Sequence, residues 1–234
     1  MLKTVKRLAA VCLAAVMAMG FVPAQQAEAA ALKKPGNCRF VKWLENDDFD
    51  ECTIKWDKVA GADGYQTLLS LTNGSRAKWN NVSKTKTSIN YYDIDDDHVW
   101  QVIVRAYKNT ANGKQYGAWS NLAFITPSPD DYRLKNVSPN AGSLQEKISW
   151  DIVKGSNGYN VFMTTTPKGT WYWNKSTDTK ATANSAVITK YRGSKLKKYT
   201  TYYFRVVTRR KRNGVFCTVP MPSSGYYLGT FRFN

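Results

Sequence analysis

The chain has 234 residues, of which 43% are hydrophobic, 13% aromatic and 22% charged. These fractions are typical of a folded globular protein and exclude a disordered tail, a coiled coil and a collagen-like rod, while the length predicts one or two domains. Lys and Arg outnumber Asp and Glu by 34 to 17, and the net charge of +17 predicts an anionic partner. One histidine and four cysteines leave little material for a metal centre or a histidine-dependent catalyst.

Residues 1–29 have the pattern of a secretory signal peptide. Three basic residues precede an apolar run at 8–19, and a small-x-small cleavage pattern follows at 27–29. The run is shorter than the roughly 20 residues of a membrane span. No later segment is apolar enough to cross a bilayer. We therefore expect a secreted, extracellular protein, free or associated with the cell wall.

The remaining sequence contains two copies of one unit. Residues 52–65 and 146–159 share Ile, Trp, Asp, Val, two Gly and Tyr at a constant offset of 94, and the same offset carries Trp79 onto Trp173. Farther along, residues 100–106 resemble residues 202–208. A repeat of this length predicts two tandem domains, at 32–127 and 128–234.

Short apolar or alternating runs separated by Gly, Asn, Asp, Ser and Pro predict β-strands and no helix after residue 29. Strands at this spacing favour an all-β fold of two tandem immunoglobulin-like β-sandwiches. Pro127-Ser128-Pro129 predicts a short, stiff connector between them. The strands are expected near 38–44, 51–57, 64–71, 76–81, 86–92, 99–108 and 116–125, and then near 146–151, 158–165, 170–175, 184–190, 200–210 and 225–233.

A strand ending in Trp, then Val-x-Gly-x-x-Gly-Tyr, then a late Tyr-x-Phe-x-Val strand resembles the fibronectin type III domain, especially in secreted bacterial proteins. The resemblance implies non-catalytic spacers and protein- or glycan-binding units. It also implies a corner tyrosine six residues after a Leu, which Leu196 and Tyr202 match. The first copy has Ile94 and Trp100 there, so only an indole N–H could form its corner bond.

Three cysteines lie beyond the predicted signal peptide. Cys38 and Cys52 flank a predicted hairpin centred near residue 45, which would place them opposite each other. Because exported proteins keep disulfides, we expect these two residues to be bridged. Cys217 is then either a buried thiol or an intermolecular link.

Nothing in the sequence indicates catalysis, and we expect no enzyme activity, no cofactor and no metal site. His98 lies beside Asp95-Asp96-Asp97 in a predicted turn, and no Gly-x-Ser-x-Gly elbow accompanies it. Acidic turns at 47–51 and 93–97 could offer oxygen ligands to Ca²⁺, but both lack the glycine and spacing of an EF-hand loop.

The positive charge is concentrated in the second predicted domain. Residues 32–127 hold 13 basic and 11 acidic residues, whereas residues 128–234 hold 18 and 5. Strand alternation predicts that part of this charge faces outward, where it would either bind a polyanion or form a solvated surface. The expected polyanion-binding residues are Lys190, Arg192, Lys195, Lys197, Lys198, Arg205, Arg209, Arg210, Lys211 and Arg212.

Export favours an anionic cell-wall polymer, a glycan or a protein at the cell surface over nucleic acid as the physiological partner. Two alternatives remain open. The acidic turns of one molecule could meet the basic domain of the next and build a self-associating, head-to-tail structural component. A carbohydrate-binding accessory module could stack sugars on Trp171 and Tyr172, whereas packing explains the repeated Trp79 and Trp173 more simply.

Overall fold

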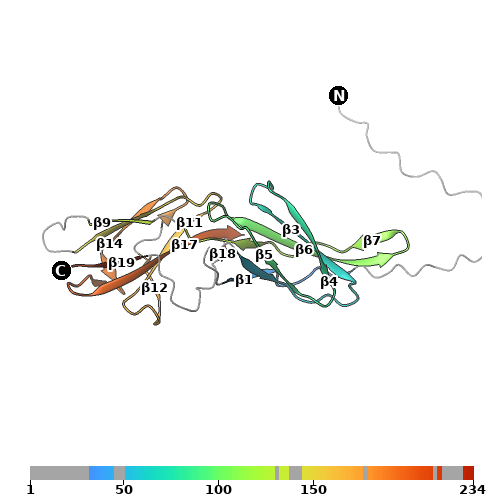
Figure 1. Ribbon diagram of the computed structural model, residues 1–234, viewed down its shortest axis with the longest axis horizontal. Coiled ribbons are helices and arrows are strands. Elements are labelled where there is room, and N and C mark those ends of the chain that lie inside the picture. Colours follow the sequence, from blue (N-terminus) through green and yellow to red (C-terminus); the bar gives the residue numbers. More distant parts are fainter. Residues whose placement is uncertain are drawn as a thin grey trace, which may run out of the picture. The chain divides into compact units, whose positions relative to one another are not determined.

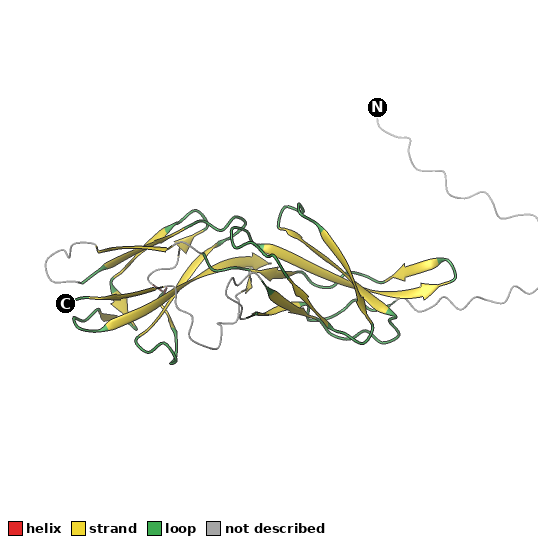
Figure 2. Cartoon of the chain, viewed as in Figure 1, coloured by secondary structure: helices red, strands yellow, loops and turns green. Residues whose placement is uncertain are grey.

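The computed structural model describes residues 32–44, 51–129, 132–136, 144–175, 179–212, 215–217 and 229–234. Every regular element named in these ranges is a β-strand, as the alternating sequence pattern predicts (Figures 1 and 2). Residues Leu32–Asn234 form a compact unit. The predicted signal peptide at 1–29 lies outside the described residues. In the described ranges, no helix is long and apolar enough to cross a membrane.

The first sandwich consists of two antiparallel sheets. One has the strand order β1-β2-β5, and the other has the order β4-β3-β6-β7 with β8 also paired to β6. The predicted strand at 116–125 is in fact two strands, β7 and β8, because the chain leaves the sheet between them. The strands are β1 (Arg39–Trp43), β2 (Cys52–Lys55), β3 (Gly64–Leu71), β4 (Lys78–Ser83), β5 (Ser88–Tyr91), β6 (Trp100–Thr110), β7 (Gly113–Tyr116) and β8 (Ala123–Ile125).

The second sandwich repeats this plan. Its sheets have the orders β14-β10-β9 and β12-β11-β17-β18, with β13 paired to β11 and β19 to β17, and β15-β16 forms a separate hairpin. Strands β9, β13, β15, β16 and β18 were not predicted. The strands are β9 (Tyr132–Asn136), β10 (Glu146–Trp150), β11 (Gly158–Thr164), β12 (Tyr172–Trp173), β13 (Thr179–Lys180), β14 (Ser185–Ile188), β15 (Lys190–Tyr191), β16 (Ser194–Lys195), β17 (Thr201–Arg212), β18 (Val215–Cys217) and β19 (Gly229–Arg232).

The sequence repeat corresponds to a repeated set of contacts. Trp56 packs on Tyr65 with ring centroids 5.4 Å apart, and Trp150 packs on Tyr159 at 5.3 Å. The Tyr65 hydroxyl accepts a hydrogen bond from the backbone N–H of Val59 at 2.9 Å. The Tyr159 hydroxyl accepts one from its equivalent, Val153, at 2.8 Å. The two copies are therefore equivalent β-sandwiches in their contacts as well as in their strand order.

The corner bond is present in both copies, with its direction reversed. In the second copy the Tyr202 hydroxyl accepts from the backbone N–H of Lys197 at 2.9 Å. In the first copy the Trp100 indole N–H donates to the backbone carbonyl of Asp95 at 3.2 Å. Asp95 and Lys197 hold equivalent positions, so the indole N–H forms the corner bond in the first copy.

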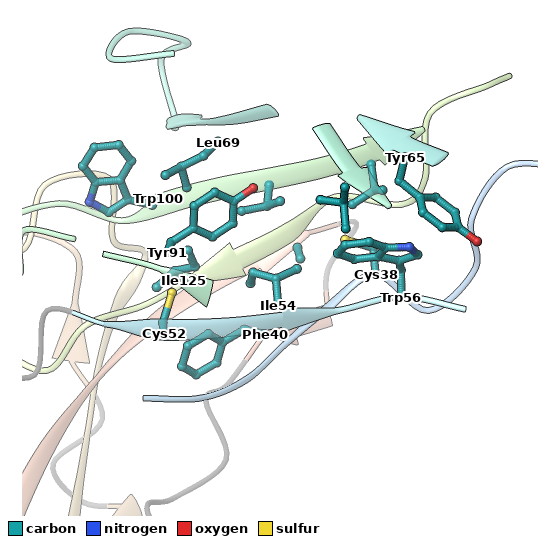
Figure 3. Close-up of a cluster of buried hydrophobic side chains, with 14 of the residues drawn as sticks. Cys38, Phe40, Cys52, Ile54, Trp56, Tyr65, Leu69, Tyr91, Trp100 and Ile125 are labelled. Carbon is teal, nitrogen blue, oxygen red and sulfur yellow. The ribbon is translucent and has the colours of Figure 1, made fainter. Parts of the chain in front are cut away.

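The predicted bridge between Cys38 and Cys52 is wrong. Both side chains are buried in the first core, where no disulfide joins them and Figure 3 draws them well apart. The register pairs Cys52 with Trp43 and Lys55 with Arg39, so Cys38 lies at the opposite end of the ladder. A separation of about four residues is roughly 13 Å, well beyond disulfide reach. The hairpin is centred later than residue 45. The side chain of Cys217 lies outside the described residues.

Candidate anion-binding site

The hairpin β15-β16 carries Lys190, Arg192 and Lys195, three of the predicted polyanion-binding residues. Tyr191 pairs with Ser194, and the two residues between them, Arg192 and Gly193, have φ values of 52° and 83°. Two consecutive residues of positive φ are the geometry of a tight two-residue hairpin turn. The register also places Lys190 directly opposite Lys195. Like charges at facing positions destabilise a hairpin, and a bound anion would relieve this repulsion.

A pocket of about 420 Å³ opens between this hairpin, the end of β11 and the start of β17. Its cations are Arg192, Lys195 and Lys197. Residues that carry hydroxyl groups complete the lining: Thr165, Tyr191, Ser194, Thr200 and Tyr202. Among the described residues, no carboxylate lines the pocket. We refer to these eight residues as the basic pocket.

Aromatic side chains connect the basic pocket to a predicted glycan-stacking residue. The Arg192 guanidinium lies 4.2 Å from the ring centroid of Tyr172. Tyr172 in turn contacts Tyr191 edge-on at 6.0 Å. A guanidinium stacked on a ring is held in place while its N–H donors remain available at its edge. The structure therefore brings Tyr172 next to the basic residues.

The first basic cluster is solvent-exposed at all five positions: Lys190, Arg192, Lys195, Lys197 and Lys198. Within the described part of the chain, none of these five side chains forms an ion pair with a carboxylate. Lys190 and Lys198 lie beside the basic pocket in sequence but outside its lining. This cluster therefore presents uncompensated positive charge to solvent.

The second basic cluster consists of the predicted residues on β17, which are Arg205, Arg209, Arg210, Lys211 and Arg212. It differs from the first cluster because two of its side chains are buried. Arg205 and Arg209 lie on the outer face of the sheet, as alternation predicts, but are only 4% and 6% exposed. Burial lowers the pKa of Arg205 to about 10, so it remains charged at neutral pH. The expectation that these two guanidinium groups face solvent is wrong, since alternation identifies a face but not whether that face is covered.

The other members of the second cluster have separate environments. Arg209 donates to the backbone carbonyl of Thr179 at 2.7 Å, and Arg210 donates to that of Gly155 at 2.7 Å. Lys211 is exposed. The side chain of Arg212 lies outside the described residues. The nine predicted residues whose side chains the structure describes therefore have different environments, and three of the exposed ones, Arg192, Lys195 and Lys197, line a pocket.

The tryptophans of β12 and its flank also differ from expectation. Trp171 is half-buried, and the Arg205 guanidinium lies 5.0 Å from its ring centroid. Trp173 and its counterpart Trp79 are 42% and 53% exposed, so packing in the core does not explain their repetition. Register explains it instead, because both residues lie on the outer face of an edge strand, opposite Phe162 and Leu68.

Sequence reasoning missed a cluster of aromatic rings around a cation in the first sandwich. The Arg105 guanidinium lies 3.7 Å from the ring centroid of Tyr116 and 4.4 Å from that of Trp119. Two of its nitrogens donate to Gln66 Oε1, at 3.0 and 2.6 Å. Trp79 extends the cluster, 5.9 Å from Trp119. The residues come from four separate segments, so no local motif could identify the cluster.

The acidic turn near His98 is occupied by local contacts. Asp95 pairs with Arg76, and its Oδ1 lies 2.9 Å from His98 Nδ1. In the described ranges, no three His, Cys, Asp or Glu side chains cluster in a way that could hold a metal ion. Of the other acidic turn, at 47–51, residues 47–50 lie outside the described residues. Asp95 therefore interacts with Arg76 and His98 of its own chain rather than with a neighbouring molecule.

Comparisons with known proteins return structural neighbours only. No protein-family model matches the chain, and no curated protein sequence matches it either. A two-domain fibronectin type III segment of chicken tenascin aligns at 13% identity and a TM-score of 0.34, covering 86% of this chain and 99% of that one. Fibronectin domains 1–3 of chicken CNTN1 align at 16% identity and a TM-score of 0.31, covering 80% and 60%. The central fibronectin-III array of RIM-binding protein aligns at 16% identity and 0.30, covering 88% and 70%.

Proposed function

We propose that this protein is an exported, non-catalytic binding module that recognises an anionic polymer at the cell surface through the basic pocket. The observation that carries the proposal is the pocket lining: among the described residues it consists of three cations and five hydroxyl-bearing residues, with no carboxylate. Cations supply long-range attraction, and hydroxyl groups add short hydrogen bonds to phosphate or sulfate oxygens. The first sandwich, with nearly balanced charge, then serves as a spacer.

The predicted export of the protein favours some anionic polymers over others as its ligand. The basic start, short apolar run and cleavage pattern of residues 1–29 favour export, which would bring the basic pocket to wall polymers and surface glycans rather than to nucleic acid. Teichoic-type wall polymers and sulfated glycans both repeat a negatively charged group along a flexible chain. A pocket flanked by the exposed Lys190 and Lys198 could engage successive charges of either polymer.

The test is charge reversal in the pocket, Lys195→Glu together with Lys197→Glu. Retention of the protein on immobilised wall teichoic acid and on heparin would be measured over a salt series. The double variant should lose more than about tenfold in affinity at low salt, and the slope of log K against log salt should fall by about one per lost contact. A variant that binds as tightly as the parent, with the same slope, would rule the pocket out.

A matched control separates the pocket from the net charge. Lys84→Glu with Lys108→Glu changes the net charge by the same amount, at two exposed positions of the first sandwich. This control should retain most of the affinity, because screening limits the influence of distant charges. Equal losses in both double variants would mean that overall charge, and no particular site, drives binding.

A further inference from the structure

A second pocket lies in the first sandwich, between the edge strands of its two sheets. Strand β4 is the outermost strand of one sheet and β5 of the other, and the chain passes directly from β4 to β5. The space that both strands line has a volume of about 520 Å³. That volume is within the range of sites that hold small organic ligands. It differs from the basic pocket in sandwich, strands and chemistry.

Two residues of this lining, Asn81 and Asn90, carry carboxamide side chains. Asn81 Oδ1 accepts a hydrogen bond from Lys114 Nζ at 3.3 Å, and Asn90 Oδ1 accepts from the Thr53 hydroxyl at 2.9 Å. Both carbonyl oxygens are therefore engaged. In the described residues neither NH₂ group has a hydrogen-bond partner, so each keeps two N–H donors. Donors of this kind bind hydroxyl and acetal oxygens.

The same lining offers apolar surface and an exposed ring. Val82 is buried and Ile89 half-buried, while Tyr92 is 54% exposed. An amphipathic tyrosine ring can stack on the C–H face of a sugar while its hydroxyl stays in water. Of the residues that the structure describes, Lys86 is the only charged one in the lining of the pocket, and none is a carboxylate. The lining therefore suits a polyhydroxylated, uncharged ring better than an ion.

We propose that this pocket, the amide pocket, binds a neutral oligosaccharide, with Tyr92 stacking on a sugar ring and Asn81 and Asn90 donating to its oxygens. The inference rests on the amide pocket alone and does not depend on the basic pocket. With both sites occupied, one chain would bridge an uncharged glycan and an anionic polymer.

The test uses calorimetric titration of the folded protein with cellotetraose, chitotetraose and mannotetraose. At least one of these sugars should bind, with an affinity that stays constant from about 0.05 to about 0.5 M NaCl because no ion pair is involved. Tyr92→Ala should weaken that binding by about tenfold through loss of the stacked ring. Tyr199→Ala is the matched control, since Tyr199 is an exposed tyrosine of the second sandwich and should leave the affinity unchanged.

Three outcomes would overturn the inference. They are no binding by any of the three sugars, equal affinity of the Tyr92→Ala variant and its parent, and binding of an extended peptide but no sugar, which would assign the β4 and β5 edges to strand addition. Because Lys195→Glu with Lys197→Glu should leave sugar binding intact, failure at the amide pocket is distinguishable from failure at the basic pocket.

Discussion

The two sandwiches have equivalent cores but differ on the outer face of the larger sheet. In the first, Arg105 lies opposite Gln66, half-buried between aromatic rings. In the second, Arg205 lies opposite Phe162, the counterpart of Leu68, and is buried. Each guanidinium stacks on aromatic rings because a planar, weakly hydrated cation packs well there. A count of charges therefore overstates the number of cations that a ligand can reach.

What distinguishes the second sandwich as a binding surface is the β15-β16 hairpin. It adds exposed cations beside a pocket, whereas the first sandwich has an amide-lined pocket with a single lysine in its lining. Two copies of one scaffold thus offer different chemistry at sites outside their common core. Variants that affect one copy and spare the other test this difference.

The largest effect should come from breaking a repeated core contact. Trp150→Ala removes a buried indole that packs on Tyr159, and it should lower the free energy of unfolding by about 3–5 kcal/mol. Trp173→Ala, in the same sandwich but exposed, should cost at most about 0.5 kcal/mol. Urea unfolding followed by circular dichroism measures both values. Equal losses would contradict the assignment of Trp150, and not Trp173, to the core.

A smaller effect should follow from the corner bond. Tyr202→Phe keeps the ring but removes the oxygen that accepts from the Lys197 N–H, which should cost about 1–2 kcal/mol. Tyr199→Phe, at a tyrosine that is 68% exposed, should leave stability unchanged. Thermal unfolding of the two variants distinguishes them. If Tyr202→Phe melts with the parent, the hydroxyl does not contribute to the corner.

Most of the fold could be predicted from local patterns. The constant offset between the copies identified the Trp–Tyr core pairs, and alternation located the long strands such as β3, β6 and β17. Strands of two residues, including β13, β15 and β16, carry no periodicity and were missed. Strand β9 was also missed.

The candidate sites were harder to predict because they depend on tertiary pairing. Register decides whether Cys38 can meet Cys52, and only the paired strands reveal it. The predicted basic residues Arg192, Lys195 and Lys197 do converge, but Thr165 lines the same pocket from the end of a different strand, β11. The amide pocket is lined by two edge strands whose side chains match no motif.

The smallest expected effect concerns one buried position, which is occupied by Cys52 in the first sandwich and by Glu146 in the second. Burial raises the pKa of both groups, to about 12 for Cys52, so the thiol stays neutral at pH 7. A carboxyl whose pKa is raised on folding stabilises the folded protein at pH values below the ordinary pKa of Glu. This stabilisation is lost as the pH rises through the pKa of the carboxyl in the folded state. Glu146→Gln should therefore be more stable than the parent at neutral pH and equal to it in acid. Melting temperatures across this range measure the difference. A pH-independent difference for Glu146→Gln would mean that burial at this position does not disfavour the charged form.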